Sequence, residues 1–282
     1  MATISELRPS PIAGTWYEGN PQRLSRSVDE YLDHAQLPPL EGEVIGVIAP
    51  HAGHRYSGPV AGYAFAAVRG LSPDLVAVIS PMHQAYPQPL ITTAHAAYST
   101  PLGIVPVDQQ AVVDLSSRVK SRLGFGISPV TYDQEHSLEI ELPFLQRTLG
   151  KEFHILPVMV RQVDPVTSRE LGNALAKVLS GKKALLVAST DLSHFYTQDE
   201  ANKLDEEMLK QIESFDPDKL FEAEAHGQGF ACGLGATAAV MWAARSMGAD
   251  KVQLLNHATS GDVTGDYSSV VGYGAAALLK SN

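Results

Sequence analysis

The chain has 282 residues, 44% of them hydrophobic, which suits a globular protein with one large α/β domain or two small ones. Its formal net charge of -10 argues against a nucleic-acid-binding surface. No run of about 18 apolar residues is present, so no membrane-spanning helix is expected.

The expected location is a reducing cytoplasm. Cys232 is the single cysteine, which excludes an internal disulfide. The stretch from Met1 to Pro11 lacks a basic region followed by an apolar core, so it does not have the pattern of a secretory signal.

Helix and strand patterns alternate along the chain. Asn20 and Pro21 have the residue types of a helix cap and first position, and Leu24 and Val28 continue an apolar face. Further helices are predicted over residues 59–68, 109–123, 135–149, 165–179, 198–215 and 236–247. Strands are predicted over residues 44–48, 75–80, 153–160, 184–189, 251–257 and 269–278, with a pair of short strands within 87–107.

This alternation predicts the α/β class. Strands that alternate with helices form a three-layer α/β/α sandwich with a mainly parallel or mixed central sheet. We find no internal repeat and no linker long enough to separate domains, so we predict a single domain over residues 1–282.

Three apolar strands each lead within a few residues to a histidine, namely His51, His83 and His194. After the first strand, Pro50 and Gly53 end the extended run and force a turn. Ligands and catalytic groups collect at the carboxyl ends of strands in open α/β sheets. One such histidine alone would be interpreted as a hydrogen-bonded loop residue, but three at equivalent strand ends favour a functional site.

Cys232 allows two interpretations. A lone free cysteine is often a small buried hydrophobic residue. It lies just before a predicted helix, however, where the helix dipole lowers a thiol pKa and favours a thiolate ligand or nucleophile. Two imidazoles and one thiolate suit iron, copper or zinc and leave positions open for water or substrate.

Two acid–imidazole pairs stand near these positions. Asp191 and His194 follow one strand and can serve as general base and proton relay, although Asp191 is equally suited to capping a turn. Glu135 and His136 open a predicted helix and are expected to support the site from outside the ligand set. No Gly-rich phosphate loop and no Gly-x-Ser-x-Gly elbow is present.

Taken together, these segments resemble the Memo family, whose bacterial and archaeal members are called AmmeMemoRadiSam system protein B. The resemblance covers nearly the whole chain. It is carried by Ala13-Gly14-Thr15-Trp16-Tyr17, Ala49-Pro50-His51-Ala52-Gly53, Ser80-Pro81-Met82-His83, Glu135-His136-Ser137-Leu138-Glu139, Ser189-Thr190-Asp191-Leu192-Ser193-His194 and Ala231-Cys232-Gly233.

The resemblance implies a fold like that of the class III extradiol ring-cleaving dioxygenases. It also implies that His51, His83 and Cys232 are metal ligands, with Asp191 and His194 as the adjacent catalytic pair. The dioxygenases complete their ligand set with a carboxylate, whereas the matching position here is Cys232, and a thiolate alters the charge and redox behaviour of a metal. Family membership further implies a functional association with an AMMECR-type protein and a radical SAM protein.

Two functions are therefore expected from different classes. The first is a redox or dioxygenase-like protein with a mononuclear site, most suited to iron (Fe²⁺) with copper or zinc as alternatives, that acts on an unidentified small molecule. The second is a binding module that holds a peptide or a modified residue in the same pocket without turnover.

Overall fold

The computed structural model describes residues 6–281. Within them, a large mixed sheet has four parallel strands at its centre. In spatial order these are β2 (Glu43–Ala49), β9 (Ala184–Ser189), β3 (Leu75–Pro81) and β8 (His154–Val160). All four are rich in apolar and β-branched residues and are buried along nearly their whole length, as expected for parallel strands covered on both faces.

Antiparallel strands extend this sheet on both sides. Next to β2 lies β12 (Val270–Lys280), which also pairs with β11 (Lys251–Thr259) and β10 (His194–Tyr196). Next to β8 lies β4 (Leu90–Thr93), followed by β7 (Ser128–Val130). The sheet is therefore mixed, as predicted.

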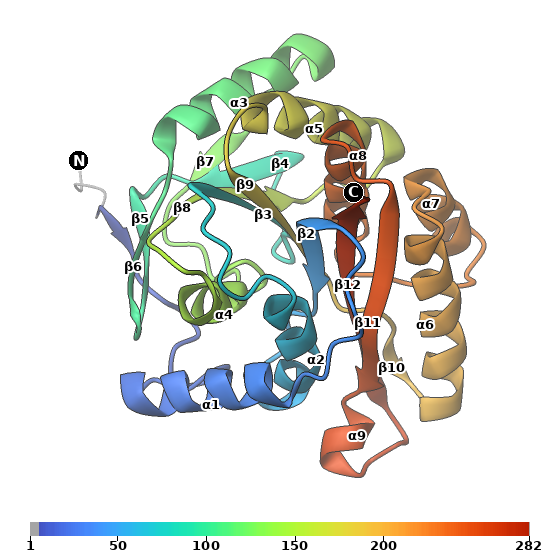
Figure 1. Cartoon of the computed structure of the whole chain (residues 1–282). Coiled ribbons are helices and arrows are strands. Elements are labelled where there is room, and N and C mark those ends of the chain that lie inside the picture. Colours follow the sequence, from blue (N-terminus) through green and yellow to red (C-terminus); the bar gives the residue numbers. More distant parts are fainter. Residues whose placement is uncertain (1–5, 282) are drawn as a thin grey trace.

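Helices cover both faces and enclose two separate hydrophobic clusters (Figure 1). One face carries α3 (Gln109–Leu123), α5 (Pro165–Leu179), α6 (Gln198–Glu213), α7 (Pro217–Ala225) and α8 (Leu234–Ser246). The other carries α1 (Pro21–His34), α2 (His54–Ala66), the 3₁₀ turn η1 (Glu139–Glu141) and α4 (Leu142–Thr148). The predicted three-layer α/β/α sandwich is confirmed.

A small second sheet lies beside α4 and contains the first described residues of the chain (Figure 1). Its strands are β1 (Leu7–Arg8), β5 (Ala97–Thr100) and β6 (Gly103–Pro106). Residues 87–107 were predicted to form a pair of strands. They form three, because β4 joins the large sheet and β5 and β6 join the small one.

The helix predicted over residues 135–149 was placed too early. The helical segment begins with η1, and α4 follows with Pro143 in its first turn, where a missing amide hydrogen costs nothing. Before it, the Glu135 carboxylate accepts hydrogen bonds from the amides of His136 and Ser137, at 3.0 and 3.1 Å. Such side-chain bonds to nearby amides compete with helix formation.

The helix predicted from Pro59 begins earlier, at His54. The carbonyl of Gly53 accepts from the amides of Tyr56 and Ser57, so the first turn forms ahead of the proline. A short helix, α9 (Gly261–Thr264), was not predicted.

In the described part of the chain, no helix has both the length and the apolar character needed to cross a membrane. The sequence indicated that the segment Met1 to Pro11 lacks the pattern of a secretory signal. Residues 1–5 of this segment lie outside the described residues.

His54 joins the start of α2 to η1. Its side chain is buried, and Nε2 donates to the carbonyl of Ile140 at 3.0 Å, while Nδ1 has no hydrogen-bond partner within residues 6–281. Burial lowers the pKa of His54 to about 4, because protonation would place a charge in the core.

We expect His54 to make stability dependent on pH. Between pH 6.5 and about 4 the unfolded chain binds a proton at His54 that the native protein excludes, so the free energy of unfolding falls as pH falls. His54→Gln keeps a donor for Ile140 but cannot titrate. One titrating proton contributes up to about 1.4 kcal/mol per pH unit to the slope of the unfolding free energy against pH. The slope of His54→Gln should therefore be smaller than that of the wild type by up to this amount. Urea unfolding across this range measures the slope, and the exposed His34→Gln should match the wild type. An unchanged slope in His54→Gln would contradict a neutral, buried His54.

Candidate metal centre

The candidate site lies where β2, β9 and β3 end side by side. Ile48 and Ile79 both pair with Ala188 of the middle strand, so the three carboxyl ends stand at one level. The amide of Thr190 donates to the carbonyl of Ala49 at 2.8 Å and holds the first two strand ends together. This common edge places the loops after the three strands next to one another.

Three histidines meet at this edge: His51 after β2, His83 after β3, and His136 before η1. Among the described residues, one ring nitrogen of each lies within 4.8 Å of the others. Imidazole nitrogens bind first-row metals at about 2.0–2.1 Å, so a small inward movement brings all three onto one ion. The group can hold a metal ion.

Burial favours the neutral form of His51 and His136. Burial lowers the pKa of His51 well below its usual value, and the charges of His136 and His83 lower it further. Burial likewise lowers the pKa of His136 to about 4, although the charge of Glu135 opposes this shift. Neutral imidazoles have free lone pairs at neutral pH, which metal binding requires.

Cys232 lies against His51. Its Sγ is 3.1 Å from His51 Nε2 and accepts a hydrogen bond from the amide of Asp191 at 3.2 Å. Burial raises the pKa of the Cys232 thiol, and the charge of Asp191 raises it further, so the residue is a thiol when no metal is bound. The expected lowering by the helix start does not dominate, which leaves Cys232 unsuited to act as a free nucleophile.

Gly233 allows the cysteine to reach this position. A Cβ at Gly233 would lie 2.3 Å from the carbonyl oxygen of Ser189 and 2.7 Å from the Cβ of Thr190. Only glycine permits so close an approach of the segment before α8 to the end of β9. The amide of Gly233 also donates to the Thr190 hydroxyl at 2.9 Å.

Glu135 orients His83. Its Oε1 accepts from His83 Nδ1 at 2.9 Å, and its Oε2 accepts from the His83 amide at 2.6 Å. Burial alone would raise the pKa of Glu135, but the hydrogen bond and charge of His83, with the charge of His136, hold it well below its usual value. An ionised carboxylate only accepts, so His83 Nδ1 is the donor in this hydrogen bond, and Nε2 is the ring nitrogen left to bind a metal.

Ser189 contacts Nδ1 of His51 and is itself hydrogen-bonded to Glu141. The Ser189 Oγ lies 2.9 Å from His51 Nδ1 and donates either to the Ser137 carbonyl at 2.6 Å or to Glu141 Oε1 at 2.7 Å. Burial raises the pKa of Glu141 well above its usual value, which favours the protonated carboxyl. Hydrogen bonds of this kind, made by the ring nitrogen that does not bind metal, fix the ring orientation of metal-binding histidines.

Asp191 supports the loop after β2 rather than His194. Its Oδ1 accepts from the His51 amide at 2.7 Å, and its carbonyl accepts from the Cys232 amide at 3.2 Å. Burial raises the pKa of Asp191 to about 7, against the lowering effect of the His51 and Ala52 amides. The structure shows neither predicted contact of Asp191: His194 Nδ1 donates to Leu192, and Asp191 caps the loop that carries His51 rather than a turn that contains His194.

His194 stands at the start of β10, outside the three-histidine group. Its Nδ1 donates to the carbonyl of Leu192 at 2.8 Å, so Nε2 is its proton acceptor. Burial lowers the pKa of His194, and the charge of His83 adds to the effect. His194 is thus within electrostatic range of His83.

A cavity of about 500 Å³ is lined by residues that neighbour the candidate histidines in sequence, among them Ala52 after His51 and Phe195 after His194, but not by the histidines themselves. Its walls include Trp16, Tyr56, Phe195 and Tyr273, with Asp266 as the charged side chain. The Trp16 ring lies 4.1 Å from that of His136, centroid to centroid, and Phe195 directly follows His194. Phe195 is exposed and has a φ of 66°, a left-handed conformation that is uncommon for an aromatic residue and often marks a functional site.

The sequence indicated most of these residues but not their roles. It placed His51, His83 and Cys232 together as ligands, and the structure brings His51 next to each of the other two. Glu135 accepts two hydrogen bonds from His83, and its supporting role at a metal site stays a prediction. His136 was also predicted as a supporting residue, yet it stands in the three-histidine group, so the final ligand set stays a prediction. Ser189 and Glu141 were not singled out.

Fold and site together define an α/β protein with an imidazole-rich centre at a parallel strand edge. The family model described as Memo-like protein matches residues 8–277. A MEMO1 family protein of Nitrosopumilus maritimus is 35% identical over 97% of this chain and 100% of its own length. One of Thermotoga maritima is 35% identical, over 96% of this chain and 99% of its own. The chain belongs to the Memo family.

The protonated state of Glu141 has a measurable consequence. Above pH 4.5 the unfolded chain releases the Glu141 proton while the native protein retains it, so the free energy of unfolding falls as pH rises. Glu141→Gln is neutral and nearly isosteric, and its side chain does not titrate. It should therefore reduce the slope of the unfolding free energy against pH by up to about 1.4 kcal/mol per pH unit, the contribution of one proton. Chemical unfolding from weakly acidic to weakly alkaline pH tests this, with the exposed Glu222→Gln as control. A pH slope in Glu141→Gln equal to that of the wild type would contradict the raised pKa of Glu141.

Proposed function

We propose that this protein binds one first-row transition metal, with iron (Fe²⁺) as the first candidate and copper or zinc as alternatives. The observation that carries the proposal is the convergence of three imidazoles at one strand edge, with the Cys232 thiol 3.1 Å from His51 Nε2. Mixed nitrogen and sulfur donors suit these metals better than magnesium or calcium. The chemistry we propose is redox or dioxygenase-like, on a small molecule.

We propose His51, His83 and Cys232 as the ligands, with His136 as the competing third ligand. Cys232 is favoured because its sulfur already contacts His51 and is held by the Asp191 amide. Coordination removes the thiol proton, which offsets the effect of burial on its pKa. His136 instead stacks on the His83 ring, with centroids 4.8 Å apart and an angle of 12° between the ring planes.

The remaining residues would serve binding and proton movement. Bound iron supplies one-electron redox chemistry. His194, neutral and with Nε2 available, would accept a proton from the substrate and return it. Asp191 would keep the His51 and Cys232 loops together through their amides. The cavity between Trp16 and Phe195 would hold the substrate and limit access of water.

Family membership supports two wider proposals. We place the protein in the cytoplasm, in functional association with an AMMECR-type protein and a radical SAM protein. Because the net charge is -10, we do not propose a nucleic-acid partner.

The alternative is a binding module without turnover. The exposed aromatic rings of Trp16, Tyr56 and Phe195 around the cavity favour it, because such rims bind peptide side chains. Metal-loaded protein that consumes no oxygen and alters no catechol-type compound, while it still binds ligand in His51→Ala, would support the module.

Single substitutions should separate the two ligand sets. We expect His51→Ala, His83→Ala and Cys232→Ser to lose at least nine-tenths of the metal bound by anaerobically purified protein, since each removes a direct ligand, at a cost of about tenfold or more in affinity. His136→Ala should retain most of it, and the exposed His226→Ala is the control. Metal analysis by mass spectrometry gives the readout. Loss in His136→Ala with retention in Cys232→Ser would establish the three-histidine set, and unchanged metal in all four variants would eliminate the site.

The reactivity of Cys232 gives a second test. A thiolate bound to metal is shielded, so iodoacetamide should label Cys232 slowly in metal-loaded protein and faster after chelation. Aerobic handling of the loaded protein should also produce sulfinic or sulfonic acid at this residue. Mass spectrometry of the folded protein measures both. If labelling is equal with and without chelator, Cys232 is a packing residue.

A further inference from the structure

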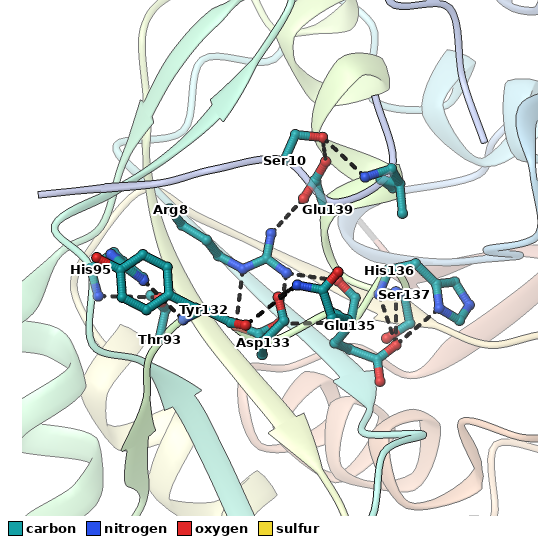
Figure 2. A network of polar contacts seen from close by, with 12 residues as sticks. Arg8, Ser10, Thr93, His95, Tyr132, Asp133, Glu135, His136, Ser137 and Glu139 are labelled. Carbon is teal, nitrogen blue, oxygen red and sulfur yellow. Dashed lines mark hydrogen bonds and ion pairs between the residues drawn. The ribbon is translucent and has the colours of Figure 1, made fainter. Parts of the chain in front are cut away.

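Arg8, in the short strand β1, is a buried arginine far from the candidate ligands in sequence. It is 1% exposed, and its guanidinium lies 4.8 Å from the centre of the Tyr98 ring on β5. Burial of an arginine is costly unless its donors are paired. Here the partners all come from the segment 133–139, which also carries Glu135 and His136 (Figure 2).

The guanidinium contacts three acidic residues of that segment in different ways. It binds the Asp133 carboxylate with two donors, Nε at 3.0 Å and Nη2 at 2.6 Å. Nη1 donates to Glu139 Oε2, and Nη2 also donates to the backbone carbonyl of Glu135 at 2.7 Å. Asp133 and Glu139 are thereby paired with Arg8, and the Glu135 carboxylate is left to face the histidines.

This arrangement holds the Glu135 backbone at both ends. Its carbonyl accepts from Arg8 Nη2, and its amide donates at 3.1 Å to Asp133 Oδ1, the oxygen that Arg8 itself binds. With the main chain fixed, the carboxylate is directed at His83, where it accepts from Nδ1 and from the amide. One chain of hydrogen bonds therefore connects the guanidinium to the His83 ring.

Glu139 extends the same network to the other side of the site. Its Oε1 accepts from the Ser10 hydroxyl and, at 2.7 Å, from the Tyr17 hydroxyl. The residue next to Tyr17 is Trp16, whose ring packs on His136 and whose carbonyl accepts from the His54 amide at 2.8 Å. The N-terminal arm, residues 8–17, is thus fixed to the segment that presents His136.

We propose that Arg8 is a positioning residue for the metal centre, acting through Glu135 to set the orientation and proton position of the His83 ring. This inference rests on the proposed metal site. Arg8 touches no candidate ligand. Its role is to separate the carboxylates of one short segment, so that two of them bind its guanidinium and the third orients a ligand. A planar fork with several donors can do this, whereas a single ammonium cannot reach every partner.

The test uses Arg8→Met, with Arg147→Met as the matched control. Arg147 also binds a carboxylate with two donors, to Asp29 at 2.8 and 2.7 Å, but it has no connection to His83. Loss of a supporting partner commonly lowers metal affinity about 10- to 100-fold. We therefore expect Arg8→Met to weaken binding of Fe²⁺ or Co²⁺ at least tenfold and to change the visible spectrum of the Co²⁺ form. Arg147→Met should change neither.

A second readout does not depend on metal. In metal-free wild type, long-range ¹H–¹⁵N spectra of the histidine rings should show His83 protonated at Nδ1. Arg8→Met should give a mixture of the two ring forms. If the wild type binds no metal, the proposed function fails, but this spectrum still tests Arg8. If metal binds normally and the His83 signal is unchanged in Arg8→Met, the Arg8 inference fails while the metal site stands.

Two further results would decide against Arg8. Equal weakening of metal binding in Arg147→Met, at a similar loss of thermal stability, would show a general effect of destabilisation. If Arg8→Met does not fold, Arg8→Lys takes its place, because it keeps a positive charge between Asp133 and Glu139 but lacks the fork. It should fold, show the mixed His83 signal and bind metal more weakly than wild type. Wild-type affinity and His83 signal in Arg8→Lys would overturn the inference.

Discussion

The parallel register of β2, β9 and β3 is the constraint on which the site depends. Since Ile48 and Ile79 flank the same residue of the middle strand, three loops begin at one level and must share the space above it. Hydrogen bonds hold two of these loops together: the Thr190 amide donates to the carbonyl of Ala49, and the Asp191 carboxylate accepts from the His51 amide in the loop after β2. A shift of one residue in any strand would turn its side chains to the other face and disperse the histidines.

Above this edge, the protein keeps the candidate donors neutral and confines charge to paired acids. His51 and His136 are uncharged because burial opposes protonation, and Cys232 keeps its proton for the same reason. Glu135 is the ionised partner, stabilised by the donors of His83. A cation that enters meets lone pairs and one nearby negative charge, so the metal-free site is already polarised for it.

The sequence allowed much of the fold and part of the site to be predicted, for identifiable reasons. β2 and β3 are apolar runs with Pro50 just after the first and Pro81 at the end of the second, a strong local signal that indicated both their positions and their histidines. The Memo motifs added Cys232, whose proximity to His51 no local pattern could reveal, since 181 residues separate the two. The errors share this origin. The helix over 135–149 begins late because Glu135 bonds to its own following amides, a conformation held by Arg8 from 125 or more residues away. Asp191 was assigned to His194 from their spacing, whereas the β2–β9 pairing gave it the His51 amide instead.

The long sequence separations within the centre also order its assembly during synthesis. Arg8 is made early but has no carboxylate to bind until the chain reaches Asp133, and His51 has no sulfur neighbour until Cys232 has emerged. Closing such long loops has an entropic cost that the contacts formed early in folding do not offset. The long-range contacts of Arg8 and of His51 therefore form late in folding. A nascent chain that has exposed only His51 and His83 offers two imidazoles whose positions are not yet fixed, and such a pair would bind metal weakly. The candidate donors therefore come together only after the chain has been made as far as Cys232 and these long loops have closed.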